Sequence, residues 1–215
     1  MDMPAKPRRV AIIGAGVNGL ATAKTFHHFG HDVTVYERGG HVGGVWAPEK
    51  RYPGLRLQST GDFYYFSDLD SVPAQFTEEN PDAEHVYGYL LSYAEKHGIL
   101  PLVQYHTTLV HAQPLYDDLE IIPTRDGSEA AADDAGGAAG KGITDRPPVG
   151  WRLTLRRAAA GRGAADGADA AAEPAAAAAA EEDEEFTVSC DVLVACTGTF
   201  SDPNIPPYKG ASRTS

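Results

Sequence analysis

Short apolar runs alternate with a segment of helical periodicity in the first forty residues. Val10–Ile13 is an apolar run that ends at Gly14, which is typical of a buried parallel strand. Apolar side chains then recur at helical spacing over Val17–Phe29, and Gly30 is placed to end that helix. A second strand is expected at Asp32–Glu37. Strand, helix and strand within about thirty residues predict a βαβ unit.

The later part of the chain predicts one more helix and several strands. The helix is expected over Pro81–His97, with Asn80 as its N-cap and the proline in its first position. Strands are expected near Val103–Val110, at Trp151–Arg156, and in two pieces within Phe186–Ala195. The fold class is therefore expected to be α/β, a Rossmann-like βαβ domain with an added antiparallel β-meander.

Two segments lack the large apolar side chains that a core needs. Asp126–Pro148 and Ala158–Glu185 consist mainly of Ala, Gly, Asp and Glu in low-complexity order. Such segments bury too little surface to offset the entropy of ordering them. We expect a single domain over residues 1–215, with low-complexity insertions at 126–148 and 158–185 in surface loops.

Charge and cysteine content restrict the partners and the compartment. The formal net charge of −12 disfavours binding to nucleic acid or to an anionic membrane surface. No segment approaches the ~20 apolar residues of a membrane span. Cys190 and Cys196 lie six residues apart in one short strand region, where a disulfide would require the backbone to bend. Free thiols favour a reducing compartment, so we expect a cytoplasmic protein.

The first turn carries a dinucleotide-binding fingerprint. Gly14, Gly16 and Gly19 form the pattern G-x-G-x-x-G between the expected strand and helix. The first glycine permits the tight turn, the second lets the backbone approach a pyrophosphate, and the third lets the helix pack on the strand. The phosphates then meet the unpaired N–H groups of a helix that begins with Val17 and Asn18.

The residues after the second strand indicate which dinucleotide binds. Glu37 is placed to accept hydrogen bonds from a ribose 2′-hydroxyl and would repel a 2′-phosphate, which favours FAD or NAD over NADP. Arg38 is a further candidate contact, although its side chain should point to the opposite side of an extended strand. Gly44, Val45 and Trp46 belong to a Gly-Gly-Val-Trp segment that resembles the continuation found in flavin enzymes, and this favours FAD.

Four segments together resemble the flavin-containing monooxygenases, a group that includes Baeyer–Villiger and N-hydroxylating enzymes. They are the Gly14–Gly19 fingerprint with Glu37, the Gly43–Trp46 segment, Tyr52–Thr60 with Tyr65–Asp68, and Ala195–Gly198 with Pro203–Pro206. The last two are the more specific, because generic dinucleotide-binding proteins lack them.

This resemblance implies an activity and additional site residues. FAD would be reduced by NADPH and would react with O2 to give a C4a-hydroperoxide, which inserts one oxygen atom into a small-molecule substrate. Gln58 occupies the place where many members carry an asparagine near the reactive edge of the flavin, so it is the candidate catalytic residue. Val110, Thr197 and Gly198 are expected to be further contacts to FAD. No metal is expected.

The resemblance stops before the NADPH-binding region. The family carries a second G-x-G-x-x-G after the segment that matches Pro203–Pro206, and this chain has none. The sequence is therefore expected to be an incomplete FAD domain, truncated before the NADPH domain, which a partner chain could supply. Two alternatives stay open: a non-catalytic FAD-binding fragment, and an FAD-dependent oxidase or dehydrogenase. The sequence does not identify the substrate.

Overall fold

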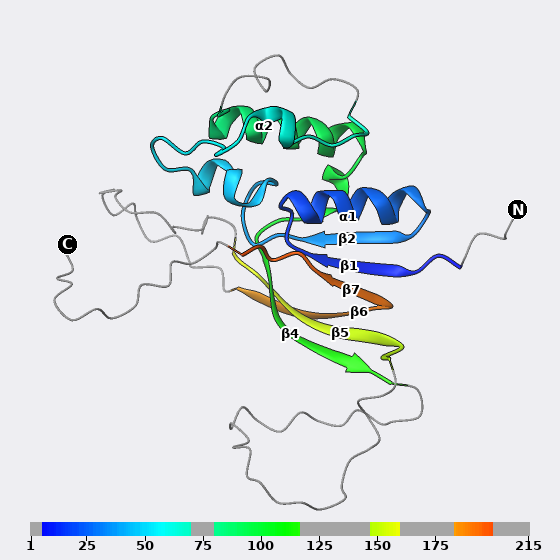
Figure 1. The fold of residues 1–215 in the computed structure, drawn as a ribbon. Coiled ribbons are helices and arrows are strands. Elements are labelled where there is room, and N and C mark those ends of the chain that lie inside the picture. The colour runs from blue at the N-terminus through cyan, green and yellow to red at the C-terminus, as the bar shows by residue number, and fades with distance from the viewer. Residues whose placement is uncertain (1–5, 70–79, 117–146, 160–182, 200–215) are drawn as a thin grey trace, which may run out of the picture.

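Two β-sheets and two α-helices form the computed structural model of the protein, which describes residues 6–69, 80–116, 147–159 and 183–199 (Figure 1). The first sheet is parallel, with strand order β3-β2-β1-β7. Its strands are β1 (Arg9–Ile13), β2 (Asp32–Tyr36), β3 (Val103–Gln104) and β7 (Val192–Ala195). The second sheet is an antiparallel meander of β4 (Thr107–Leu115), β5 (Gly150–Arg157) and β6 (Glu184–Cys190). The predicted fold class is confirmed.

The parallel sheet is buried on both faces, which explains why its strands are continuous apolar runs. In β1, Val10 and Ile12 belong to the hydrophobic cluster on the helical side. Ala11 and Ile13 belong to a second cluster, which includes Leu153 of β5. Figure 1 shows the helices α1 (Val17–His28) and α2 (Ala83–Lys96) on one side of this sheet and the meander on the other.

Helix α2 begins two residues later than expected, and its N-cap is Asp82 rather than Asn80. The carboxylate of Asp82 accepts a hydrogen bond of 2.9 Å from the backbone N–H of His85. Asn80 instead adopts a left-handed conformation with φ of 55°. The carbonyl of Pro81 accepts a bond from the N–H of Leu57, so this proline serves the preceding loop and not the helix.

The single strand expected near residues 103–110 is two strands in different sheets. Strand β3 pairs with β2 in the parallel sheet, whereas β4 starts the meander. His106 lies between them with φ of 53°, and this left-handed residue turns the chain from one sheet into the other. The N–H of Thr107 donates to the carbonyl of Glu37, which fixes the start of β4 beside the end of β2.

The insertion predicted at 158–185 extends too far, because strand β6 already begins at Glu184. Glu184 and Glu185 belong to β6 and lie opposite Arg157 and Arg156 of β5. Both pairs form ion pairs, at 3.3 and 3.5 Å, which explains acidic residues at the start of a strand. The remainder of this insertion, and nearly all of that at 126–148, lies outside the described residues. Within the described part of the chain, neither helix has the length and apolarity to cross a membrane.

Candidate functional site

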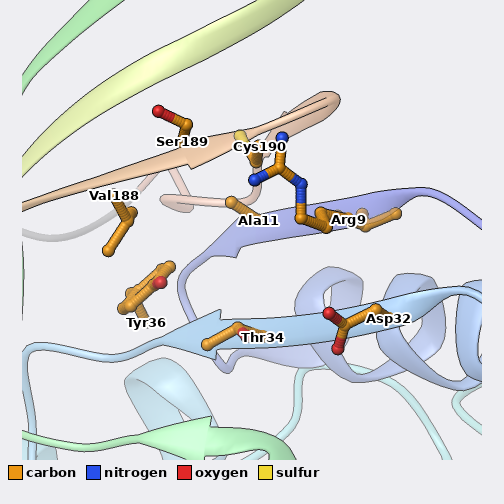
Figure 2. Close-up of a pocket in the computed structure, with 9 residues that line it drawn as sticks. Arg9, Ala11, Asp32, Thr34, Tyr36, Val188, Ser189 and Cys190 are labelled. Carbon is orange, nitrogen blue, oxygen red and sulfur yellow. The ribbon is translucent and has the colours of Figure 1, made fainter.

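A pocket of about 150 Å³ opens between the two sheets (Figure 2). It contains none of the residues that the sequence proposes as a site, and the Arg9 side chain at its rim is bonded to Asp191 at 3.2 Å. Cys190 also lines the pocket, and burial raises the pKa of its thiol. The pocket is lined by Arg9, Val10, Ala11, Asp32, Thr34, Tyr36, Val188, Ser189 and Cys190.

The predicted site instead forms where β1 ends and α1 begins. Gly14 has φ of 99°, a conformation that side chains rarely adopt, and its N–H donates to the Tyr36 carbonyl at 2.8 Å. A Cβ on Gly14 would lie 2.5 Å from the carbonyl oxygen of Cys196, just beyond β7. A Cβ on Gly19 would lie 1.9 Å from the carbonyl oxygen of Gly14. The turn, the helix and the end of β7 are thus in direct backbone contact.

Gly16 is different, because the protein itself leaves room for a side chain there. A Cβ on Gly16 would meet only ordinary contacts, the nearest at 3.7 Å from Cα of Gly44. Gly16 is the N-cap of α1, with no side chain bonded to the cap and no acid in the first turn. Unpaired N–H groups at such a helix start are suited to an anion. The space beside Gly16 and the N–H groups at the start of α1 would suit a phosphate group.

A second glycine turn packs on the first. The N–H of Gly43 donates to the Ala15 carbonyl at 2.8 Å, and a Cβ on Gly44 would lie 3.2 Å from Cα of Gly16. Gly44 also has φ of 60°, and the short 3₁₀ turn Gly44–Trp46 begins there. The two glycine-rich segments, separated in the sequence, therefore form one backbone surface around the start of α1.

Glu37 connects these turns to the end of β2. Its Oε2 accepts a hydrogen bond of 2.7 Å from the N–H of Ala15, and its Oε1 accepts one of 2.8 Å from the N–H of Gly39. A carboxylate has about four acceptor positions, so both oxygens retain capacity for a ligand hydroxyl. The acid that the sequence assigned to a ribose thus lies directly beside the first glycine turn.

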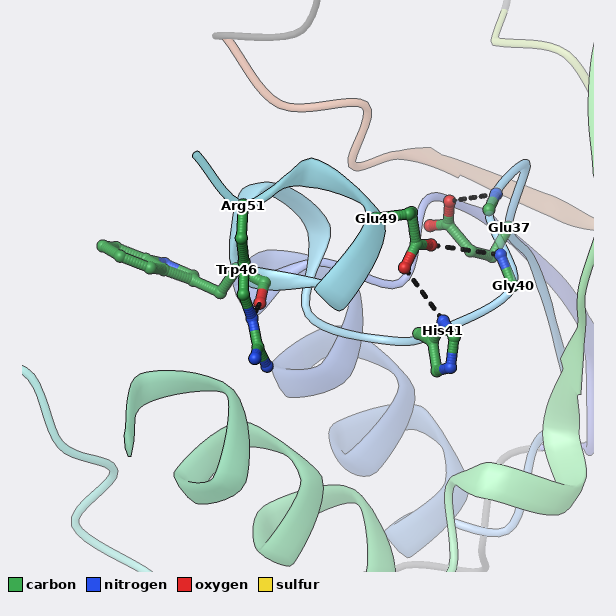
Figure 3. Close-up of polar contacts among 7 residues, drawn as sticks. Glu37, Gly40, His41, Trp46, Glu49 and Arg51 are labelled. Atoms are coloured by element: carbon green, nitrogen blue, oxygen red, sulfur yellow. Dashed lines mark hydrogen bonds and ion pairs between the residues drawn. The ribbon is translucent and has the colours of Figure 1, made fainter. Parts of the chain in front are cut away.

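A second carboxylate, Glu49, occupies the same region (Figure 3). Its Oε1 accepts a bond of 3.2 Å from the N–H of Gly40, and its Oε2 pairs with Nδ1 of His41 at 2.9 Å. Sequence reasoning missed Glu49 because it lies in an irregular segment, the 3₁₀ turn Pro48–Lys50, where spacing gives no signal. Its proximity to Glu37 arises only when the loop folds back.

Trp46 is buried in the helical-side core, with 9% of its surface exposed. Its Nε1 donates to the hydroxyl of Tyr64 at 3.2 Å, and burial raises the pKa of that tyrosine. The carbonyl of Trp46 accepts from Nε of Arg51, whose guanidinium lies 4.9 Å from the ring centre of Tyr87. These contacts hold the segment after Gly44 against α2.

The aromatic end of the third resembling segment also has a structural role. The ring of Phe66 stacks on Tyr93 of α2 with centroids 3.9 Å apart, and its N–H donates to the hydroxyl of Tyr89. Asp68 pairs with Lys24 of α1, and this hydrogen bond holds the pKa of the carboxyl below its ordinary value. Burial raises the pKa of Tyr93 to about 12. Residues 66–68 thereby connect α1 with α2.

Two of the remaining candidate residues begin α1, Thr197 lies near the first glycine turn, and the others are described by their exposure. Val17 and Asn18 begin α1, and Cα of Thr197 would be 3.6 Å from a Cβ on Gly14. Val110 lies in β4 at an irregularity of the β4–β5 register and is 45% exposed. Four other candidates are exposed: Arg38, Val45, Gln58 and Gly198.

The described residues hold no cluster of His, Cys, Asp or Glu suited to a metal ion. Cys190 and Cys196 are free thiols. They do not lie on one strand, as the sequence suggested: Cys190 ends β6, and Cys196 follows β7.

Comparison with known proteins places this geometry in context. The family model of the NAD(P)-binding Rossmann-like domain matches residues 12–90. "Probable flavin-containing monooxygenase 1" of Arabidopsis thaliana is 37% identical over 109 residues, 51% of this chain and 20% of that protein. Over these residues the chain is similar to flavin-containing monooxygenases. A 4-hydroxybenzoate brominase (decarboxylating) of Marinomonas mediterranea is 32% identical over 106 residues, 49% of this chain and 20% of that protein.

Solved structures of other proteins share the fold of this chain. The S-allyl-L-cysteine S-oxygenase of Allium sativum superposes with a TM-score of 0.59 at 18% identity, over 95% of this chain and 39% of that chain. A steroid monooxygenase bound to NADP gives a TM-score of 0.56 at 20% identity, over 96% of this chain and 29% of that chain. The chain thus spans a minor part of the length of the flavin-containing monooxygenases that it matches.

Proposed function

We propose that this chain binds FAD, with the adenosine diphosphate part of the cofactor at the first glycine turn. The observation that carries this proposal is the space above Gly16, where the protein could hold a methyl group but has none. The uncapped start of α1 would supply N–H donors to the diphosphate, and Glu37 would accept from the ribose. Gly44 would bring a second stretch of backbone to the same phosphates.

The reaction proposed for the whole protein is monooxygenation of a small molecule with NADPH as reductant. Support comes from the homology to flavin-containing monooxygenases and from neighbours of the same fold whose names include FAD and NADP. FAD, when bound, would supply the redox chemistry and the activation of oxygen. The residues of this chain would hold and orient the cofactor, and Gln58, which is exposed, would contact its reactive edge.

Isotope labelling tests this function. The complete natural protein, purified with FAD, would be supplied with NADPH, ¹⁸O₂ and a thioether or amine. One ¹⁸O atom per molecule of product, in proportion to the NADPH consumed, would support monooxygenation. Hydrogen peroxide formed in proportion to NADPH, without labelled product, would instead indicate an oxidase.

A further inference from the structure

The loop after β2 carries two carboxylates around one glycine. A Cβ on Gly39 would lie 2.6 Å from Oε1 of Glu49 and 3.3 Å from Oε1 of Glu37. Both oxygens lie close to this one position, so the two carboxylates are close to each other. Glu37 follows the end of β2, and Glu49 lies in the 3₁₀ turn Pro48–Lys50. The Glu49 side chain is 22% exposed, so its charge is only partly screened by water.

These two acids also occupy the backbone donors of the loop. The N–H of Gly39 is bonded to Glu37. The N–H of Gly40 is bonded to Glu49 (Figure 3). Successive backbone N–H groups in a turn form a concave donor site that is suited to an anion. In this protein its own carboxylates take both donors.

We propose that Glu49 is a specificity-determining residue that excludes dinucleotides with a 2′-phosphate from this site. The inference rests on the proposed binding of the adenosine ribose by Glu37. A 2′-phosphate on that ribose would meet two carboxylates instead of one, and it would find the N–H of Gly40 already occupied. Glu49 thus acts on one class of ligand by repulsion and by removing a donor, while a free ribose hydroxyl is unaffected.

The test compares two small probes that differ only in the 2′-phosphate: ADP and 2′-phospho-ADP. Each is titrated against the FAD-loaded protein, and displacement of FAD gives the two dissociation constants. Glu49→Gln removes the charge and retains an acceptor for the N–H of Gly40. Glu49→Ala removes both. Glu185→Gln removes one charge from the exposed edge of the meander and serves as the matched control.

The wild-type protein is expected to prefer ADP by at least about tenfold, and Glu49→Gln should reduce this preference by roughly fivefold, since one charge at this range contributes about 1 kcal/mol. Glu49→Ala should reduce the preference further, because it also frees a donor. Glu185→Gln should leave it unchanged. A purely structural role would weaken both probes equally, and an unchanged ratio in both Glu49 variants would overturn the proposal. Failure of ADP to displace FAD from the wild type would instead contradict the proposed FAD site.

Discussion

Replacing Gly19 and Gly16 separately by alanine should distinguish a glycine that the fold needs from one that the ligand needs. In Gly19→Ala the new methyl group would lie 1.9 Å from the Gly14 carbonyl oxygen, well inside van der Waals contact, and this obstacle is a backbone group that cannot rotate away. Helix α1 would have to move away from β1. Overpacking of this kind lowers the free energy of unfolding by about 3 kcal/mol. The gain in helix propensity from alanine, about 1 kcal/mol, is smaller and does not compensate.

The expected effect of Gly16→Ala is the opposite. Its methyl group would sit 3.7 Å from the nearest atom of the protein, which is an ordinary contact. The poorer N-cap and the lower entropy of the unfolded chain each contribute about 0.5–1 kcal/mol with opposite signs, so stability should change little. The same methyl group would occupy the space proposed for the diphosphate, and FAD affinity should fall about tenfold or more, at least 1.4 kcal/mol.

Thermal unfolding of the two variants without FAD, followed by circular dichroism, measures the first effect. Gly19→Ala should unfold roughly 4–8 °C below the wild type, because the net loss of about 2 kcal/mol corresponds to about 2–4 °C per kcal/mol. Quenching of FAD fluorescence on titration measures the second effect in Gly16→Ala. Wild-type stability of Gly19→Ala would refute the close packing of α1 on β1. Wild-type FAD affinity of Gly16→Ala would refute the phosphate position.

Two further predictions concern single carboxylates. Glu37→Gln keeps the shape of the side chain but loses its charge, so FAD binding should weaken by about 1–3 kcal/mol, measurable by the same fluorescence titration; unchanged affinity would remove Glu37 from the ribose site. Asp68 has a lowered pKa in the folded protein because of Lys24, so its stabilising contribution is present above the ordinary value of 3.8 and is lost as the pH falls through the lowered value. The melting temperature should therefore decrease more steeply below about pH 4 in the wild type than in Asp68→Asn, and parallel curves would contradict this assignment.

Local patterns were sufficient for the βαβ unit because each of its signals has a local cause. The apolar runs of β1 and β2, the periodicity of α1 and the spacing of three glycines all depend on neighbours within a few residues. The roles assigned to Gly14 and Gly19 follow from backbone geometry and are visible in the structure without a ligand.

Other features depended on contacts between distant segments. The strand pattern of residues 103–110 continues through His106, and only the pairing of Thr107 with Glu37 shows where the chain changes sheet. Asn80 and Asp82 are both good N-cap types, and the choice was made by the bond from Leu57 to the Pro81 carbonyl.

The positions of three acidic residues could not be predicted from the sequence for the same reason. Glu184 and Glu185 continue an acidic, low-complexity run, so the sequence assigned them to the insertion. Their place in β6 depends on the arginines that face them in β5. Glu49 reaches the loop after β2 only because the segment after Gly44 folds back. In each case the interaction that fixes the acidic residue joins positions that are well separated in the sequence, so a local pattern does not predict it.

Direct titration of FAD into the purified protein, by calorimetry, tests the central claim. We expect one FAD to bind per chain and to be displaced by ADP but not by FMN, because the glycine turns and Glu37 would hold the adenosine diphosphate part. Absence of FAD binding, or displacement by FMN with no effect of ADP, would contradict it.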